Sequence, residues 1–206
     1  GYEYWGRAAS LIHTTVDGKA DIPLLPHERI YHLASAQHYV GGFPQTSDRV
    51  GNAPVFQGNL LDFSGNYRAL LVRLLEWVKD RKDPPPSKYP KIGEATLVAP
   101  RDVDFPSIPG VVFPKTIHVA YRADYGPRWP QGIVDVQPPR LGPAFPSLIA
   151  QVDKIGNELG GVRNVEIRVP LATYAPWSLR AGQLANPTEL SDFVGTTIPL
   201  PRTKAE

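Results

Sequence analysis

Residues 29–38, RIYHLASAQH, decide how this sequence is interpreted. The first six alternate polar and apolar side chains and include a β-favouring isoleucine and tyrosine, a pattern typical of a short strand. Three more residues lead to His38, and two glycines soon follow, as is typical of a loop. The sequence therefore predicts a histidine at the end of a strand, a position that suits a catalytic base.

The composition is that of an ordinary globular protein. The 206 residues suffice to enclose a core, and 42% of them are apolar and 20% charged. No apolar run has the length of about 18 residues that a membrane span needs. The formal net charge of +2 is small, and lysine and arginine are dispersed. We therefore expect a soluble protein with no membrane span and no nucleic-acid partner.

The chain contains no cysteine and no methionine. The lack of cysteine excludes disulfides, thiolate nucleophiles and cysteine-ligated metals, and it removes thiol usage as a guide to the compartment. Localisation therefore stays open, with secretion and the periplasm among the alternatives. Because a translated chain starts with methionine, we expect further residues to precede Gly1 in the natural protein.

A helix ending at a triple proline is the most regular predicted element. Ser64 is the expected N-cap, and apolar side chains at helical spacing continue to about residue 79. These are Tyr67, Leu71, Leu74, Leu75 and Val78. The prolines at 84–86 end the helix and mark the expected boundary between two parts, residues 1–83 and 84–206.

Other segments favour short elements. Residues 3–12 have the composition and spacing of a short helix. Beyond the triple proline, short β-favouring runs alternate with turn residues, and most of the 23 prolines lie there. The runs cover 95–98, 116–121, 147–152 and 165–169. We expect residues 84–206 to form a proline-rich, β-leaning extension packed on a core formed by the first part.

Two common catalytic motifs are absent from the sequence. The nucleophile elbow G-x-S-x-G does not occur, and the nearest fragment, FSGN at 63–66, lacks the first glycine and precedes a helix. The spacing of His27, Glu28 and His32 does not match the zinc motif H-E-x-x-H. The 206 residues thus show no credible serine nucleophile, and metal catalysis is disfavoured.

His38 has a structural and a catalytic interpretation. A single histidine is more often a packed or hydrogen-bonded structural group. Glu3, however, starts the opening helix, and an acid followed by a histidine at the ends of successive strands is the order of the last two triad members in an α/β-hydrolase. Glu3 also has a simpler interpretation, since the helix dipole favours a carboxylate in a first turn. Weaker substitutes for the acid are Asp17, Asp21 and Asp62.

Several longer segments carry a resemblance to a known family. They are GYEYWGRAASLIHTTVDGKAD, RIYHLASAQH and FQGNLLDFSGNYRALLVRLLEWVKDRKDPPPSKYP, followed by YRADYGPRWPQGI, QPPRLGPAFPSLIAQVDKIGNELGGVR and VPLATYAPWSLR. Together they cover nearly the whole chain. The sequence resembles the C-terminal half of a large family of bacterial α/β-hydrolase domain proteins, although that family more often continues from a strand at the position of Gly1.

The resemblance implies a fold and a function. The fold is α/β, with this chain holding the last strands and helices of an α/β-hydrolase sheet. The function is that of an esterase-like serine hydrolase with an acyl-enzyme mechanism, a small-molecule or polymeric ester substrate and no cofactor. Glu3 resembles the family's acid and His38 its histidine. The nucleophile is implied to lie in an N-terminal portion of the same hydrolase, either as upstream sequence or as a separate chain.

Two further expectations concern the pocket and a rival function. Gln37 is expected to position His38, to line the pocket or simply to be exposed, and Phe43 and Phe56 are expected to line an apolar pocket. Other aromatic residues, Phe63, Trp129 and Trp177, line that pocket or belong to the core. The rival function is a non-catalytic binding or structural module derived from the hydrolase scaffold.

Overall fold

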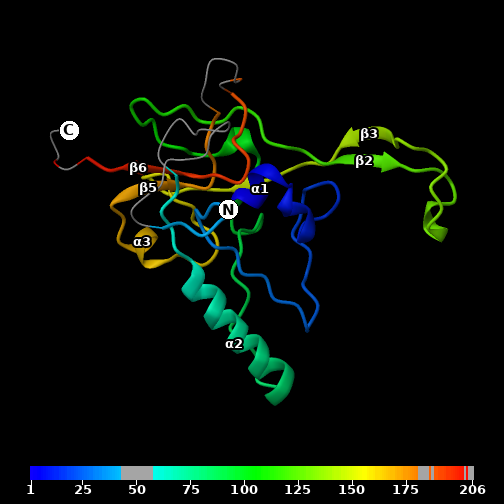
Figure 1. Cartoon of the computed structure of the whole chain (residues 1–206), viewed down its shortest axis with the longest axis horizontal. Coiled ribbons are helices and arrows are strands. Elements are labelled where there is room, and N and C mark those ends of the chain that lie inside the picture. Colours follow the sequence, from blue (N-terminus) through cyan, green and yellow to red (C-terminus); the bar gives the residue numbers. More distant parts are fainter. Residues whose placement is uncertain (43–57, 181–185, 187, 202, 204–206) are drawn as a thin grey trace.

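The computed structural model describes residues 1–42, 58–180, 186, 188–201 and 203. Its helices are α1 (Tyr2–Gly6), α2 (Ser64–Asp80) and α3 (Val165–Arg168), with 3-10 turns at η1 (Ala9–Ile12), η2 (Pro100–Asp102) and η3 (Trp129–Gln131). Its strands are β1 (Leu97–Val98), β2 (Tyr121–Asp124), β3 (Arg140–Ala144), β4 (Ile149–Ala150), β5 (Ala172–Ala175) and β6 (Thr196–Pro199). Figure 1 shows these elements.

The regular strands form three small antiparallel sheets. β1 pairs with β4, β2 with β3, and β5 with β6. All four residues of β5 are buried, whereas every residue of β2 and β3 is exposed. The β2–β3 hairpin projects from the body of the molecule, as Figure 1 shows. Short β elements thus occur after the triple proline, as expected. All three of these sheets are antiparallel, and parallel pairing occurs only as isolated bridges among the described residues.

The segment before His38 is extended and carries that parallel pairing. Tyr31 forms an isolated parallel bridge with Lys88, and Leu33 forms one with Val162. The N–H of His32 donates to the carbonyl of Lys88 at 2.8 Å. Residues 29–34 therefore have the direction expected of a strand in an α/β sheet, but within the described chain their pairing is confined to these single bridges.

The helix predictions are confirmed in outline. α2 spans nearly the expected residues, although Ser64 lies inside its first turn and the carboxylate of Asp62 accepts the Ser64 N–H at 2.9 Å. The expected helix over 3–12 is broken into α1 and η1, because Ala8 adopts a left-handed conformation with φ of 51°. This break keeps α1 short, so that Glu3 lies in its first turn.

Two strand predictions were wrong. Residues 165–168 form the helical turn α3, in which Ile167 is buried and Val165 is 67% exposed, and Val169, just after the turn, is 71% exposed. A strand would place these three side chains on one face, so the helical turn is what lets Ile167 enter the core alone. Residues 116–120 form no regular strand, and pairing starts only at β2.

The core consists of two clusters that draw on distant parts of the chain. The first joins α1 to β1, β4 and the C-terminal region through Tyr4, Trp5, Leu97, Ile149, Ala175, Trp177, Leu179 and Leu190. The second joins the residues before α2 to α3 and β5 through Ala36, Leu61, Phe63, Ile167, Ala172 and Tyr174. Both clusters combine residues from before and after the triple proline. The division into two parts at residue 83 stays a prediction.

The helix α2 is the exception to this packing. None of its residues is buried in the described structure, and Leu71 and Val78 are 66% and 69% exposed. Figure 1 shows α2 extending away from the body of the molecule. Its apolar stripe is therefore largely exposed in the described structure. No helix in the described part of the chain is long and apolar enough to cross a membrane.

Candidate active site

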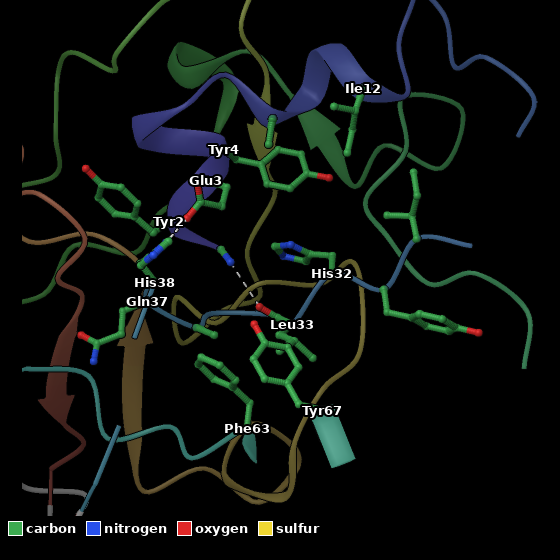
Figure 2. A pocket seen from close by; sticks show the side chains of 15 residues that line it. Tyr2, Glu3, Tyr4, Ile12, His32, Leu33, Gln37, His38, Phe63 and Tyr67 are labelled. Carbon is green, nitrogen blue, oxygen red and sulfur yellow. Dashed lines mark hydrogen bonds and ion pairs between the residues drawn. The ribbon is translucent and has the colours of Figure 1, made fainter. Parts of the chain in front are cut away.

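Glu3 and His38 meet at the N-terminal end of α1. The N–H of Tyr2 donates to the carbonyl of Ala36 at 3.1 Å, which joins the start of α1 to the loop before His38. Glu3 Oε1 then lies 2.5 Å from His38 Nδ1, as Figure 2 shows. The structure thus brings together the two residues that the sequence singled out.

This contact determines which nitrogen of His38 is basic. An ionised carboxylate only accepts hydrogen bonds, so neutral His38 carries its proton on Nδ1 and donates it to Glu3. The second nitrogen, Nε2, then has the free lone pair. Both side chains are 42% exposed, so the pair lies at the surface of the site rather than deep in the core.

Aromatic residues hold the His38 ring. Its centroid lies 4.4 Å from that of Phe193 and 4.9 Å from that of Tyr39. The backbone N–H of His38 also donates to the carbonyl of Phe193 at 3.2 Å. The Arg7 guanidinium lies over the Phe193 ring at 4.5 Å. The histidine is therefore restrained through both its ring and its backbone, although it is partly exposed.

Gln37 anchors the same loop from the other direction. Its Oε1 accepts the N–H of Gly195 at 2.9 Å. A Cβ at Gly195 would lie 2.5 Å from the carbonyl oxygen of Ala175, so the glycine permits this close approach of the chain. Gln37 is thus a partner of the backbone and a neighbour of the pocket rather than a freely exposed side chain.

A cavity of about 470 Å³ opens beside the Glu3–His38 pair. Its walls are mainly apolar and aromatic, and Figure 2 shows Phe63 and Tyr67 close together at one end. Of the other aromatic candidates, Trp177 is buried in the core, and Trp129 stacks on Tyr125 in the projecting hairpin. Phe43 and Phe56 lie outside the described residues.

The alternative acids are engaged elsewhere. Asp17 accepts a hydrogen bond from Thr15 within its own loop at 2.6 Å. Asp21 accepts the N–H of Gly93 at 2.8 Å. The hydrogen bond from Ser64 lowers the pKa of Asp62, whose carboxylate accepts the N–H of the first residue of α2. In the described structure none of these carboxylates bonds to His38, which leaves Glu3 as its acidic partner.

A buried hydrogen-bonded histidine–glutamate pair beneath the site was missed by sequence reasoning. His32 Nε2 lies 2.8 Å from Glu158 Oε2, and the two side chains are only 4% and 1% exposed. Burial lowers the pKa of His32, so the ring is neutral near pH 7 and donates this proton to the carboxylate. A glutamate next to turn-forming glycines is usually exposed, so no signal in the sequence pointed to the burial of Glu158.

A second buried pair lies next to it. The Tyr4 hydroxyl is 2.7 Å from His13 Nε2, and the His13 ring packs on Tyr89 with a centroid distance of 4.8 Å. Burial raises the pKa of Tyr4 and lowers that of His13. Tyr4 therefore stays protonated and donates to a neutral His13. The Tyr4 hydroxyl and His13 Nε2 thus satisfy one another, whereas His13 Nδ1 has no hydrogen-bond partner among the described residues.

Within the described residues there is no cluster of three or more histidine, aspartate or glutamate side chains placed to hold a metal ion.

In comparison with known families, residues 12–206 match the model of the alpha/beta hydrolase domain. The chain belongs to the alpha/beta hydrolase domain family. The family resemblance of the sequence is thereby confirmed, together with a hydrolase-type scaffold. No curated protein and no solved structure gave a significant match.

Membership of the alpha/beta hydrolase domain family bears differently on the two candidate residues. His38 lies inside the matched range, whereas Glu3 precedes it. The match assigns no role to individual residues, so the catalytic roles of His38 and Glu3 stay predictions. The same holds for the place of Gln37 in a pocket.

Proposed function

We propose that this chain supplies the base and the acid of a serine-dependent α/β-hydrolase that cleaves carboxylic esters. The observation that carries the proposal is the 2.5 Å contact between Glu3 Oε1 and His38 Nδ1. It resembles the acid–histidine half of a catalytic triad, in which the acid fixes the tautomer and stabilises the imidazolium. Family membership supports the hydrolase-type scaffold that such a triad needs.

In the proposed reaction, His38 Nε2 takes the proton of a serine hydroxyl as the serine oxygen attacks the ester carbonyl carbon. The imidazolium is stabilised by the Glu3 carboxylate beside Nδ1. His38 then returns the proton to the alcohol as the ester bond breaks, which leaves an acyl-serine. A water molecule, activated by the same nitrogen, hydrolyses the acyl-enzyme and releases the carboxylic acid.

We propose that the serine is contributed from outside these 206 residues, by an N-terminal portion of the same hydrolase, as upstream sequence or as a separate chain. The sequence contains no nucleophile elbow, and no serine or threonine is among the described residues that line the cavity. Ser35, in the loop before His38, is fully buried and its Oγ accepts the N–H of Glu158 at 2.8 Å. It is therefore unsuited to attack a substrate.

Two surfaces fit this arrangement. The exposed apolar stripe of α2 is the kind of helix face that normally packs against another element, and the N-terminal portion is the proposed cover. The cavity beside His38 has an apolar and aromatic lining. This lining supports an ester with an apolar acyl or aryl group as the substrate class.

The rival proposal is a non-catalytic binding module built on the hydrolase scaffold. Its support is the projecting hairpin, where Trp129 is 52% exposed and stacks on Tyr125 at 4.6 Å. An exposed aromatic ring of this kind can contribute to a binding surface when apolar neighbours extend it. The two proposals differ in whether a reactive serine accompanies the chain.

Activity-based labelling separates them. Native material that contains the chain is treated with a fluorophosphonate, and the labelled peptide is identified by mass spectrometry. The hydrolase proposal expects a labelled serine on a peptide outside these 206 residues, in the same polypeptide or in a co-purifying one. An intact preparation with no labelled serine would favour the binding module.

A further inference from the structure

Ser35 makes the bend that leads to His38. Its backbone has a φ of 59°, a left-handed conformation that is unfavourable for residues other than glycine. Each of its polar groups is occupied. Its N–H donates to Glu158 Oε2 at 2.5 Å, its Oγ accepts the N–H of Glu158 at 2.8 Å, and its carbonyl accepts from Asn59 Nδ2 at 2.6 Å. The bend is thus held by contacts from distant parts of the chain.

Glu158 joins both ends of this bend. Its Oε2 accepts from the Ser35 N–H and from His32 Nε2, at 2.5 and 2.8 Å. His32 belongs to the extended segment that enters the bend, and Ser35 is where the chain turns. A single buried carboxylate therefore fixes the direction in which the chain leaves the segment. The other oxygen, Oε1, has no partner among the described residues.

The position of the bend affects the position of His38 relative to Glu3. Ala36, the residue after Ser35, accepts the N–H of Tyr2 at 3.1 Å, and Tyr2 precedes Glu3. A rotation of the bend at Ser35 would move the Ala36 carbonyl away from α1. It would also change the 2.5 Å separation of His38 Nδ1 and Glu3 Oε1.

Burial of the Glu158 carboxylate costs free energy. Taking an ionised carboxylate out of water is unfavourable unless hydrogen bonds compensate it, so Glu158 is weak support for stability alone. The carboxylate instead fixes the local geometry, because it accepts hydrogen bonds from the His32 ring before the bend and from the backbone N–H of Ser35 at the bend. This distinguishes Glu158 from an ordinary core residue.

We propose that Glu158 is a positioning residue for the hydrolase: its carboxylate holds the bend at Ser35 so that His38 is aimed at Glu3. The inference rests on the proposed function for its catalytic meaning. Glu158 does not touch the reacting atoms and acts through the loop that ends at His38.

Kinetics of two variants test this role. Glu158→Ala removes the acceptor, whereas Glu158→Gln keeps one oxygen for both donors and places its amide where Oε1 has no partner. In the native hydrolase we expect Glu158→Ala to lower kcat per fluorophosphonate-labelled site by about 10- to 100-fold with KM changed little, because a small misplacement of a catalytic group has an effect of this size. Glu158→Gln is expected to restore kcat to within a few-fold of the unaltered enzyme.

A matched control is Glu94→Ala. Glu94 is 58% exposed and its carboxylate pairs with Lys91 at 2.8 Å on the surface. It should leave kcat per labelled site unchanged. A role for Glu158 in folding alone would lower the number of labelled sites and not the turnover of each one, and that result would overturn the proposal.

A second readout does not depend on ester hydrolysis. Long-range ¹H–¹⁵N spectra of the histidine rings report which nitrogen of His38 carries the proton. We expect the Nδ1–H form in the unaltered chain and in Glu158→Gln, and a mixture of tautomers in Glu158→Ala. An unchanged His38 tautomer in folded Glu158→Ala would contradict the positioning role. Lack of esterase activity in the unaltered enzyme would instead contradict the proposed function.

If Glu158→Ala does not fold, Ser35→Gly provides the test. Glycine suits the φ of 59°, so this change removes the hydroxyl acceptor and loosens the bend with little strain. The proposal predicts a smaller decrease in kcat per labelled site and a partial loss of the Nδ1–H form. No change in either quantity would refute it.

Discussion

Replacement of Glu3 by glutamine isolates the electrostatic part of the proposed acid. Glu3 Oε1 is 2.5 Å from His38 Nδ1, and its side chain is 42% exposed, so the amide of a glutamine has room to rotate. Its carbonyl oxygen can then accept the Nδ1 proton and keep the tautomer. The change therefore removes the negative charge beside the imidazolium while it preserves the hydrogen bond.

The expected effect follows from the exposure of the pair. Two unit charges about 4 Å apart interact with about 1 kcal/mol in water and about 4 kcal/mol at an effective dielectric constant of about 20. The pair is partly exposed, so it lies between these limits. Since about 1.4 kcal/mol corresponds to a tenfold change in rate, Glu3→Gln should lower kcat by about 5- to 1,000-fold. This is less than the roughly 10⁴-fold loss typical of a buried triad acid.

Initial rates on a p-nitrophenyl ester at saturating substrate measure this effect in the native hydrolase. Asp17→Asn is the matched control, because Asp17 is 59% exposed and bonds within its own loop. It should leave kcat unchanged. Full turnover in Glu3→Gln would refute the assignment of the acid, and a loss confined to Asp17→Asn would transfer the role to Asp17.

Three further predictions concern stability and are measured by urea unfolding. Ile149→Ala, at a fully buried position, should lower the free energy of unfolding by about 2–5 kcal/mol, whereas Leu171→Ala, at a position that is 79% exposed, should lower it by less than about 0.5 kcal/mol. Equal losses would contradict the described core. Gly161→Ala should lower the free energy of unfolding by about 1–3 kcal/mol, because φ is +95° and the new Cβ would lie 2.4 Å from the His32 carbonyl oxygen. An unchanged free energy of unfolding would contradict the described backbone conformation at Gly161. Burial lowers the pKa of His32 and His13 from 6.5, so below that pH the unfolded state binds more protons than the folded state. The free energy of unfolding should therefore decrease on acidification by up to about 1.4 kcal/mol per pH unit for each histidine. His13→Asn should reduce this dependence of stability on pH.

The helix α2 was predictable because its signals are local. The helical spacing of the apolar residues and the triple proline after it lie within one segment, and the observed bounds are Ser64–Asp80. Residues 165–169 were not predictable in the same way. Their β-favouring side chains fit a strand, but the burial of Ile167 alone favours a helical turn, and burial depends on contacts with distant residues.

The Glu3–His38 pair was predictable from the order of the two residues and from the family resemblance. The contact of 2.5 Å agrees with that expectation, although no observation yet tests the catalytic roles. Glu158 was beyond sequence reasoning for a physical reason. It follows a turn, where a charged residue is usually solvated, and only the packing of residues 32–35 against it makes it a buried hydrogen-bond acceptor.

The rate of fluorophosphonate labelling in the native hydrolase tests the role of His38 most directly. His38→Ala removes the proposed base, and His27→Ala, at an exposed position, is the matched control. The account predicts that a serine is labelled in the unaltered enzyme and in His27→Ala, and that labelling in His38→Ala is slower by about 10³- to 10⁴-fold. A labelling rate in His38→Ala within a few-fold of the unaltered enzyme would contradict the central claim.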